Sequence, residues 1–354
     1  LSTDQVTLTQ TGLFNSKNVG ASVAVTSTST LSGVDAQNYS LTQPTTITAA
    51  ITAKDITVTG LTIAASKIYD GTTNATITAG GLVTTQNTGV GSTSDGNLYN
   101  VDAVVLSGTP QAFYNSKDVA SANLATVSGY SLTGTGAGNY HLIAPTQAAT
   151  ITPKNVSIAG LTITASKTYD ATTTATITGA ATLLSQSTGS GNSADGKIYT
   201  VDPLVTLAGT ALANYDNKDV LTASTISISG LSLSGAGSSN YTLLPLSQSG
   251  TITPKNLTMT GLTLVSSSKT YDGNTTAALQ NATGLLQSPS AAGTGTSGDG
   301  VPYTGDSVTL SGTAAANYAT KNVGTGLSIV FSGVGLSGAE AGNYTLTQQT
   351  ALSN

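Results

Sequence analysis

The chain has 354 residues, with 11 basic residues, all of them Lys, against 16 acidic ones, and a formal net charge of −5 at pH 7. So few basic residues create no positive field that would attract phosphate, which excludes nucleic acid as a partner. No apolar run approaches the roughly 20 residues that cross a bilayer, so no membrane insertion is expected. Charged residues make up only 8% and Cys is missing. This composition is unusual for a cytosolic enzyme and fits a protein exported without disulfides.

Local patterning predicts β structure. Apolar and polar residues alternate in segments such as 102–108 and 126–132, which are bounded by Gly, Asn and Ser clusters, and no window of helical length shows a 3.6-residue period. About seven short strands in each repeat of about 100 residues predict an all-β array of antiparallel β-sandwich repeats of the immunoglobulin-like kind. A β-grasp-like repeat is the alternative, and it is disfavoured because no helix is visible.

Three short blocks recur at intervals of about 100 residues, which identifies a tandem repeat. The first block is Lys-x-Tyr-Asp, whose successive Tyr residues are 100 and 102 residues apart. The second is Lys-Asn-Val or Lys-Asp-Val, and the third is Asn-Tyr followed by an apolar residue two positions after Tyr. The first and third blocks supply the candidate structural residues of the repeat: Lys67, Tyr69, Asp70, Lys167, Tyr169, Asp170, Lys269, Tyr271, Asp272, Asn38, Tyr39, Asn139, Tyr140, Asn240, Tyr241, Asn343 and Tyr344.

The block counts define the domain organisation. The third block occurs four times and the first three times, so we expect the chain to be a window cut from a longer array. The expected domains are the C-terminal half of a repeat (1–50), two full repeats (51–151 and 152–252) and a repeat without its last strand (253–354). The joints are only a few residues long, and Pro153 and Pro254 fix φ there. Stiff connections between neighbouring repeats are therefore predicted.

Three positions carry predictions about turns. Gly60 separates two phases of alternation in the strand that opens the second repeat, so a bulge or a change of sheet is expected there. The pair Asp95-Gly96 predicts a hairpin turn that closes a long exposed loop. Ala171 stands where the other Tyr-Asp blocks have Gly, which suggests that this turn does not require a positive φ.

The blocks Lys-x-Tyr-Asp-Gly-Thr-Thr, Val-x-Leu-Ser-Gly-Thr, Lys-Asn-Val-Gly and Gly-Asn-Tyr-x-Leu follow one another in fixed order. Together they resemble the YDG domain, which is related to MBG repeats, over essentially the whole chain. YDG domains occur in tandem in large bacterial exoproteins similar to filamentous haemagglutinins. The resemblance implies a secreted, extracellular protein of the bacterial cell surface, and within it a stalk or filament-forming segment of an adhesin, fibre or biofilm matrix. It implies no catalytic residue, and we expect no enzyme activity.

The expected partners are neighbouring repeats and other copies of the chain in a fibre. The alternative function is an array of glycan- or matrix-binding modules that contact surface glycans. Sugar sites usually stack an aromatic ring on the sugar face, whereas this chain has no Trp and only three Phe. The stalk or filament interpretation is therefore preferred.

The recurring Tyr-Asp pairs allow two interpretations. One is a binding site, and the other is a buried Tyr packed over a turn whose Asp accepts hydrogen bonds from backbone N–H groups. The second interpretation is favoured because Asp commonly plays this part in turns.

No cofactor is expected. Asp95, Asp102 and Asp118 recur in register and are weak candidates for calcium, but no dense run of acids supplies the roughly 6 to 8 oxygens that calcium takes.

Lysines beside Asn or Asp also raise the hypothesis of intramolecular isopeptide bonds, which need a buried lysine. Lys54, Lys67 and Lys117 each lie at a joint or a turn, where a solvated lysine that caps carbonyl groups is more common than a buried one. The crosslink hypothesis is therefore disfavoured.

Overall fold

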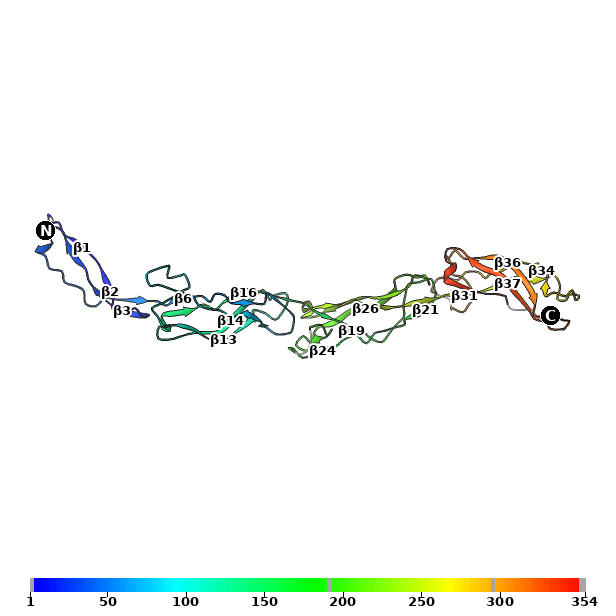
Figure 1. Cartoon of the computed structure of the whole chain (residues 1–354), viewed down its shortest axis with the longest axis horizontal. Helices are drawn as coiled ribbons and strands as arrows, with labels where there is room; N and C mark the ends of the chain where they lie inside the picture. The colour runs from blue at the N-terminus through cyan, green and yellow to red at the C-terminus, as the bar shows by residue number, and fades with distance from the viewer. Residues whose placement is uncertain (1–2, 190–192, 294–296, 350–354) are drawn as a thin grey trace. The chain divides into compact units, whose positions relative to one another are not determined.

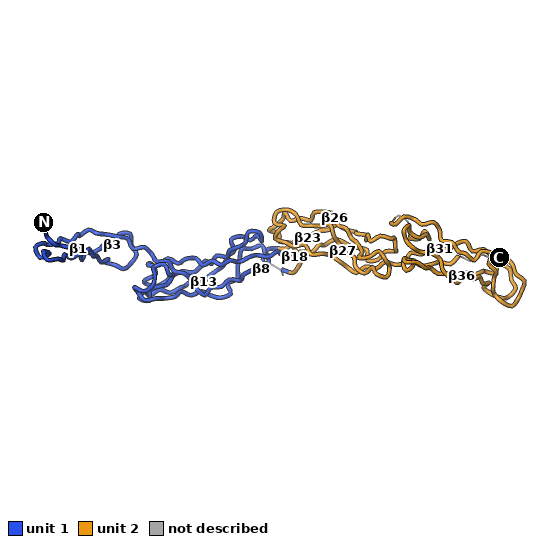
Figure 2. Tube along the Cα trace, turned by 90° about the horizontal axis from the view of Figure 1, so that it is seen from above, with its two compact units in different colours: residues 1–154, 187–193 blue, residues 155–186, 194–354 orange. Residues whose placement is uncertain are grey.

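The computed structural model describes residues 3–189, 193–293 and 297–349. It divides into two compact units, unit 1 with residues 1–154 and 187–193 and unit 2 with residues 155–186 and 194–354 (Figure 2). Within the described residues every regular element is a strand or a three-residue 3₁₀ helix. The all-β prediction is confirmed, and the helix that a β-grasp requires is not found in this part of the chain. No described helix is long and apolar enough to cross a membrane.

Unit 1 holds the half-repeat (1–50) and the second repeat (51–151). The elements of the half-repeat are β1 (Thr7–Thr9), β2 (Gly12–Phe14), β3 (Gly20–Ser27), β4 (Thr30–Ser32), η1 (Ala36–Asn38) and β5 (Thr48–Ile51). Those of the second repeat are β6 (Lys54–Ile56), β7 (Thr62–Ile63), β8 (Ser66–Ile68), β9 (Asn74–Ala75), β10 (Ile77–Ala79), β11 (Thr85–Gln86), β12 (Leu98–Tyr99), β13 (Val105–Tyr114), β14 (Leu124–Thr133), η2 (Ala137–Asn139), β15 (Tyr140–Leu142), β16 (Thr146–Ala148) and β17 (Thr150–Thr152).

Unit 2 holds nearly all of the third repeat (152–252) and the fourth repeat (253–354). The elements of the third repeat are β18 (Lys154–Val156), β19 (Ile158–Ala159), β20 (Thr162–Ile163), β21 (Ser166–Thr168), β22 (Ile177–Thr178), β23 (Thr182–Leu183), β24 (Ser185–Gln186), β25 (Ile198–Tyr199), β26 (Thr206–Tyr215), β27 (Thr225–Ser234), η3 (Ser238–Asn240), β28 (Tyr241–Leu243), β29 (Leu246–Ser249) and β30 (Thr251–Thr253). Those of the fourth repeat are β31 (Lys255–Thr260), β32 (Thr263–Leu264), β33 (Thr276–Ala277), β34 (Leu279–Asn281), β35 (Leu285–Leu286), β36 (Thr309–Tyr318), β37 (Ile329–Ser337), η4 (Ala341–Asn343) and β38 (Tyr344–Thr347). Residues 350–354, which end the fourth repeat, lie outside the described residues.

A long antiparallel hairpin is the centre of each complete repeat. In the second repeat β13 and β14 pair with each other, β9 adds to one side and β16 to the other, which gives a four-stranded sheet. Figure 1 shows the corresponding pair β36 and β37 of the fourth repeat side by side. Side chains from one face of the hairpin, such as Ala125 and Val127 of β14, are buried, whereas their neighbours along the strand are more exposed. This alternation is the period-two pattern that the sequence predicts.

The first and last strands of a repeat run parallel, which differs from the expected antiparallel sandwich. β6 pairs in parallel with β15, and β8 pairs in parallel with β17. The cause is the tandem arrangement. The strand that enters a repeat and the strand that leaves it run in the same direction, because the chain continues from one repeat into the next. Parallel pairing needs a long connection between its strands, and here the central hairpin lies within that connection.

The predicted change of partner at Gly60 is confirmed. Before this residue β6 pairs with β15, and after it β7 pairs with β10 in another sheet. Gly60 has φ +72, in the left-handed region that glycine adopts at little cost. The glycine therefore turns the strand from one sheet to the other.

The predicted hairpin at Asp95-Gly96 is wrong. The flanking strands β11 and β12 pair in parallel, whereas a hairpin requires antiparallel strands. The Asp95 carboxylate instead accepts a hydrogen bond from the Asn97 N–H at 3.0 Å, and the loop crosses over before it returns. The Asp-Gly pair forms a local turn, but this turn does not join two antiparallel strands.

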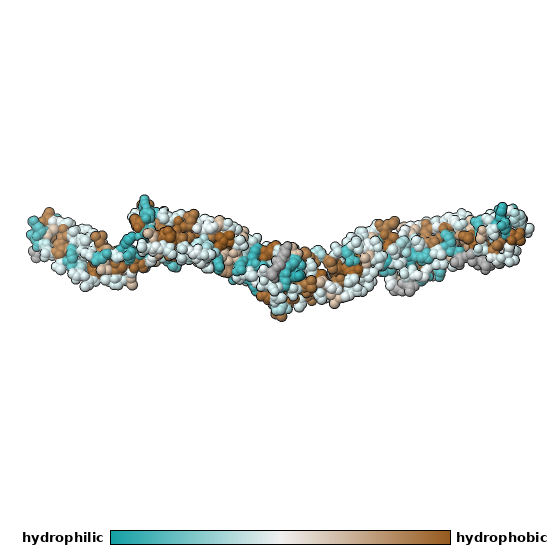
Figure 3. All heavy atoms as spheres, turned by 60° about the horizontal axis from the view of Figure 1, so that its bottom comes forward, coloured by the Kyte–Doolittle hydropathy of each residue, from teal (hydrophilic) through white to brown (hydrophobic). Residues whose placement is uncertain are grey.

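Figure 3 shows one face of the molecule coloured by hydropathy. Pale, near-neutral residues cover much of this face, with hydrophobic residues in brown and hydrophilic residues in teal between them. This distribution follows from a sequence in which only 8% of the residues are charged.

The expectation that Ala171 lies in a turn without positive φ is wrong. Ala171 has φ +61, the one positive value for a non-glycine residue in the described ranges, and the corresponding Gly71 and Gly273 have φ +77 and +82. The left-handed conformation costs an alanine roughly 1–2 kcal/mol relative to its preferred region. Hydrogen bonds of the flanking residues hold the turn in this geometry, so Ala171 is strained.

We predict that Ala171→Gly stabilises unit 2 by about 0.5–1 kcal/mol, because relief of the strain exceeds the extra entropy of glycine in the unfolded chain. The measurement is the urea midpoint of the unit 2 transition. Gly71→Ala, the reverse change at the equivalent turn, is the matched comparison and is expected to destabilise unit 1. A lower midpoint for Ala171→Gly would contradict the interpretation.

Candidate functional site

The Lys-x-Tyr-Asp block forms a rigid turn around a lysine ammonium group. Lys167 Nζ donates to Asp170 Oδ1 at 2.6 Å and to the carbonyl oxygens of Thr172 and Thr174 at 2.7 and 2.9 Å. Asp170 Oδ1 also accepts the Thr172 N–H at 2.9 Å. The turn therefore fixes the backbone on both sides of Tyr169.

The equivalent turns of the other repeats have the same bonds. Lys67 Nζ binds Asp70 Oδ1 at 2.7 Å and the Thr72 carbonyl at 2.8 Å, and Lys269 Nζ binds Asp272 Oδ1 at 2.8 Å. Capping of carbonyl groups by Lys67 is therefore as expected from the sequence.

The turn inserts Tyr169 into the next repeat. Tyr169 is fully buried, and its ring contacts two tyrosine rings of the fourth repeat. The centroid distances are 6.0 Å to Tyr303 and 5.3 Å to Tyr344, and the second contact is edge to face at 78°. Aromatic pairs prefer such tilted arrangements. We call this contact between the third and fourth repeats the Tyr169 joint.

The tyrosine hydroxyl groups of the joint converge on one carboxylate. Tyr169 Oη donates to Asp306 Oδ2 at 2.9 Å, and Tyr344 Oη donates to the same oxygen at 2.5 Å. Burial, and then the hydrogen bond to Asp306, raise the pKa of both tyrosines well above the ordinary value. Both hydroxyl groups therefore remain protonated donors. Lys218 Nζ donates to Tyr169 Oη at 3.3 Å and adds a third polar contact.

The second and third sequence blocks also meet at this joint. The Val220 N–H donates to Asn343 Oδ1 at 2.8 Å, and Asn343 Nδ2 donates to Asp219 Oδ1 at 2.9 Å. The ion pair of Asp219 with Lys218, at 2.7 Å, is the main cause that lowers the pKa of Asp219. The Lys-Asp-Val block of one repeat thus recognises the Asn-Tyr block of the next.

One strand passes through the joint with a single residue between its two parts. β30 pairs with β21 of the third repeat, and β31 pairs with β38 and β35 of the fourth. Only Pro254 separates β30 from β31, and its ring restricts φ. A single core also includes Ile252 of the third repeat and Leu257 of the fourth. The joint is therefore a packed interface without a linker.

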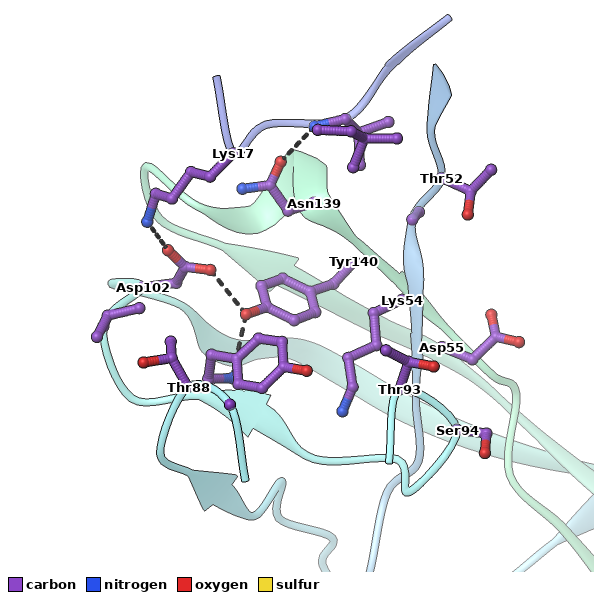
Figure 4. Close-up of a pocket in the computed structure, with 16 residues that line it drawn as sticks. Lys17, Thr52, Lys54, Asp55, Thr88, Thr93, Ser94, Asp102, Asn139 and Tyr140 are labelled. Carbon is purple, nitrogen blue, oxygen red and sulfur yellow. Dashed lines mark hydrogen bonds and ion pairs between the residues drawn. The ribbon is translucent and has the colours of Figure 1, made fainter. Parts of the chain in front are cut away.

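The contact between the half-repeat and the second repeat contains a cavity of about 660 Å³ (Figure 4). The Val19 N–H donates to Asn139 Oδ1 at 2.9 Å, as Val220 does to Asn343. Tyr140 Oη donates to Asp102 Oδ2 at 2.7 Å, and the Lys17 ammonium group binds the other oxygen of Asp102. Burial, and then the Asp102 hydrogen bond, raise the pKa of Tyr140 to about 12.

The structure corrects the expectation of solvated lysines at the joints. Lys54 is 9% exposed, and Lys154 and Lys255 are fully buried. Lys255 forms an ion pair with Asp299 at 2.8 Å and lies 3.8 Å from the centroid of the Tyr303 ring. A buried ammonium group is tolerated when a carboxylate and an aromatic face replace its hydration.

Lys54, like Lys255, is held by an ion pair. Lys54 contacts Asp95, whose pKa is lowered to about 2 mainly by that contact. Formation of an amide would need a protonated carboxyl group and a neutral amine, whereas the lowered pKa keeps the carboxylate ionised. The contact between Lys54 and Asp95 is therefore an ion pair.

The weak calcium candidates each face a lysine. Asp95 binds Lys54, Asp102 binds Lys17, and Asp118 binds Lys117 at 2.7 Å. No group of three or more His, Cys, Asp or Glu residues with metal-binding geometry occurs within the described ranges. The three carboxylates therefore have cations as partners in this structure.

The remaining candidate residues divide by burial. Tyr69 and Asn240 are fully buried, and Tyr241 is 6% exposed, with its hydroxyl group bonded to the Tyr199 N–H and to Asp202. Tyr39, by contrast, is 42% exposed, and Asn38 is also exposed. Tyr271 is 59% exposed although its turn has the same bonds as the Tyr169 turn.

Sequence reasoning missed the acceptor of the tyrosine hydroxyl groups. The sequence pattern predicts no role for Asp202 or Asp306, and it offers Asp102 as a calcium candidate alone. These aspartates recur at the same position of each repeat, as the tyrosines do. This shared period is the signal that could have identified them as the acceptors of the tyrosine hydroxyl groups. The aromatic partners Tyr99 and Tyr303 recur in the same way.

The structure defines a class of protein, an array of all-β repeats in which the Tyr169 turn of the third repeat is buried in the fourth. The chain belongs to the YDG domain family, whose domain matches four successive segments, residues 1–47, 52–149, 152–250 and 253–351. Comparison with curated proteins and with solved structures gave no match.

We predict that Tyr169→Phe destabilises unit 2 by about 1.5–3 kcal/mol, because the hydrogen bond from the buried tyrosine to the Asp306 carboxylate is lost while the ring remains. The measurement is the urea midpoint of the unit 2 transition. Tyr271→Phe, in the same turn of the fourth repeat, is the matched control and should leave the midpoint unchanged. Equal effects of the two variants would contradict the assigned role of Asp306.

The raised pKa of Tyr140 predicts a loss of stability in alkali. Its folded pKa of about 12 lies above the unfolded value of about 10, so the stabilisation is complete below pH 10 and is lost as the pH rises through 12. Unfolding of unit 1 is measured from pH 8 to 12 for the wild type and for Tyr140→Phe. The wild type should lose more stability than the variant, and parallel curves would refute the prediction.

Proposed function

We propose that this chain is a structural, non-catalytic stalk or filament-forming segment of a secreted bacterial surface adhesin or extracellular fibre. The observation that carries the proposal is the Tyr169 joint, in which a fully buried tyrosine of one repeat belongs to the core of the next. A segment that transmits force or holds a distal domain at a distance needs such coupling between neighbours.

The energetics of the joint favour this role. Full burial of one large side chain stabilises a fold by about 1.5–3 kcal/mol, and separation of the repeats would expose Tyr169. It would also remove a hydroxyl donor from Asp306 and break the bonds of Asn343 to the preceding repeat. Pro254 is the only residue between β30 and β31. Bending of the joint therefore strains the contacts of Tyr169 and Asn343 at the same time.

The composition supports an extracellular location. Small polar residues and few charges suit a non-catalytic protein surface that is exposed to the medium. The chain also has no Cys that oxidation could alter. Proteins with YDG domains are expected at the bacterial surface or in a biofilm matrix. The same location is part of the proposal for this chain.

The alternative, an array of glycan- or matrix-binding modules, has weaker support. Sugar sites use exposed aromatic faces, but the recurring Tyr69, Tyr169 and Tyr241 are buried. These residues are therefore occupied by packing, which removes most of the periodic aromatic positions from sugar binding.

The test of the stalk role is small-angle X-ray scattering of the whole chain and of a variant with Gly-Ser-Gly-Ser inserted after Thr253. The wild type is expected to give a narrow distribution of interatomic distances, and the insertion should broaden it, because flexible residues uncouple the packed joint. The same insertion after Asn87, in a loop, is the control and should have no such effect.

A wild-type distribution as broad as that of the Thr253 insertion would overturn the stalk proposal. Binding of the wild type to a panel of bacterial and host glycans, with loss of binding in a variant of an exposed aromatic residue, would instead support the alternative function.

A further inference from the structure

Parallel strand pairs hold the start of a repeat to its end. The chain enters the second repeat through β6 and leaves it through β17. β6 pairs in parallel with β15, and β17 pairs in parallel with β8. The third repeat is left through β30, which pairs in parallel with β21. Each pair therefore joins a strand from the first part of its repeat to a strand from the last part.

Parallel pairing determines how a pull on the chain acts on these strands. Ser66 at the N-terminal end of β8 lies opposite Thr150, so the C-terminal end of β17, at Thr152, is at the other end of the pair. A pull on the two sides of the repeat therefore slides one strand along the other. All hydrogen bonds of the pair are then loaded together, whereas an antiparallel hairpin pulled at its open end separates one bond at a time.

Further hydrogen bonds lengthen the β8–β17 pair at both ends. The Thr150 N–H donates to the Ala65 carbonyl at 3.0 Å, and the Tyr69 N–H donates to the Thr152 carbonyl at 2.8 Å. The Thr152 hydroxyl group donates to the Lys67 carbonyl at 3.2 Å. The number of bonds that a pull must break together is therefore larger than the strand bounds alone indicate.

The third repeat has the same additional bonds. The Thr251 N–H donates to the Ala165 carbonyl at 2.9 Å, and the Tyr169 N–H donates to the Thr253 carbonyl at 2.8 Å. The Thr253 hydroxyl group donates to the Lys167 carbonyl at 3.3 Å. The backbone of the Lys-x-Tyr-Asp block thus binds the last strand of its own repeat.

A glutamine side chain adds a bridge between an early and a late strand. Gln147 of β16 accepts the Ile63 N–H at 2.9 Å through Oε1 and donates to the Ile63 carbonyl at 2.8 Å through Nε2. Its amide group thus takes the place of a neighbouring strand beside β7. In the third repeat Gln248 donates to the Ile163 carbonyl at 3.2 Å.

We infer that the parallel pairs β6–β15, β8–β17 and β21–β30 are mechanical clamps that resist extension of the chain. The long hairpin β13–β14 lies between the clamp strands in the sequence, so it carries no load while the clamps hold. Forced unfolding depends on the barrier to rupture, and this barrier is high when many bonds break within a short displacement. The inference deepens the proposed structural function and rests on it for its biological use.

The experiment is single-molecule force spectroscopy of the whole chain, with the load applied in two directions. The chain has no Cys, so two introduced Cys residues are the only points of attachment. Ala53→Cys with Pro153→Cys loads the second repeat from its entry to its exit. Val105→Cys with Thr133→Cys pulls apart the open end of the β13–β14 hairpin, where these two residues are opposite each other.

The rupture force is expected to be severalfold higher between Ala53 and Pro153 than across the hairpin. A released length of about 3.3–3.6 Å for each residue between the attachment points identifies the rupture. Urea unfolding of the two double variants checks that their stabilities are alike, so that the direction of the load is the difference between them.

Two changes weaken the clamp from the side chains. Gln147→Leu removes both bonds to Ile63, and Thr152→Val removes the hydroxyl bond to Lys67 at an exposed position. Each should lower the rupture force from entry to exit. Gln111→Leu, in the exposed part of β13, is the matched control and should leave this force unchanged. Equal forces in the two directions, or an entry-to-exit force that neither clamp variant lowers, would overturn the inference.

The result is independent of the scattering test of the stalk role. Scattering measures how neighbouring repeats are held without load, whereas the force measurement loads one repeat alone. A broad distance distribution would overturn the stalk proposal and leave the clamps in place. Equal rupture forces in the two directions would overturn the clamps and leave the stalk proposal in place.

Discussion

The structure depends on the burial of one phenol across the boundary between two repeats. Tyr169 leaves its own repeat and donates to Asp306 of the next, so two segments far apart in the sequence share one core. A hydroxyl group placed opposite a carboxylate fixes both distance and direction, which hydrophobic contact alone does not. The rigid Lys167–Asp170 turn and the single residue Pro254 between β30 and β31 derive their importance from this contact.

Charge is scarce in this chain and is concentrated where the register must be fixed. Lys167 organises the turn, Lys218 reaches the joint, and Lys255 is fully buried beside Asp299. Buried ion pairs add little net stability, since desolvation offsets the attraction, but an unpaired partner is costly. A repeat packed in the wrong register would leave such charges unpaired. These pairs therefore disfavour incorrect packing between repeats whose sequences are nearly alike.

The sequence was sufficient for the all-β class, the period of the repeat and the change of sheet at Gly60, because these follow from alternation and from recurrence. It was insufficient at Ala171, where hydrogen bonds of the surrounding turn impose a backbone that alanine does not prefer. It also failed for Lys54, because burial of a lysine depends on a carboxylate and a ring supplied by distant segments. The hairpin predicted at Asp95-Gly96 was wrong for a similar reason, since a local turn does not determine which strands pair with each other.

Tandem repetition itself hides the most important contact. Every complete repeat carries both the Tyr-Asp turn and the Asp acceptor, so the sequence is equally compatible with a bond inside one repeat and with a bond between neighbours. Tyr169 and Tyr271 lie in turns with equivalent bonds, yet the first is fully buried and the second is 59% exposed. Burial of this tyrosine is therefore a property of the pair of repeats. In such an array the interface between neighbours contributes to stability alongside the fold of each repeat, and a repeat considered in isolation lacks the contact on which its most regular motif depends.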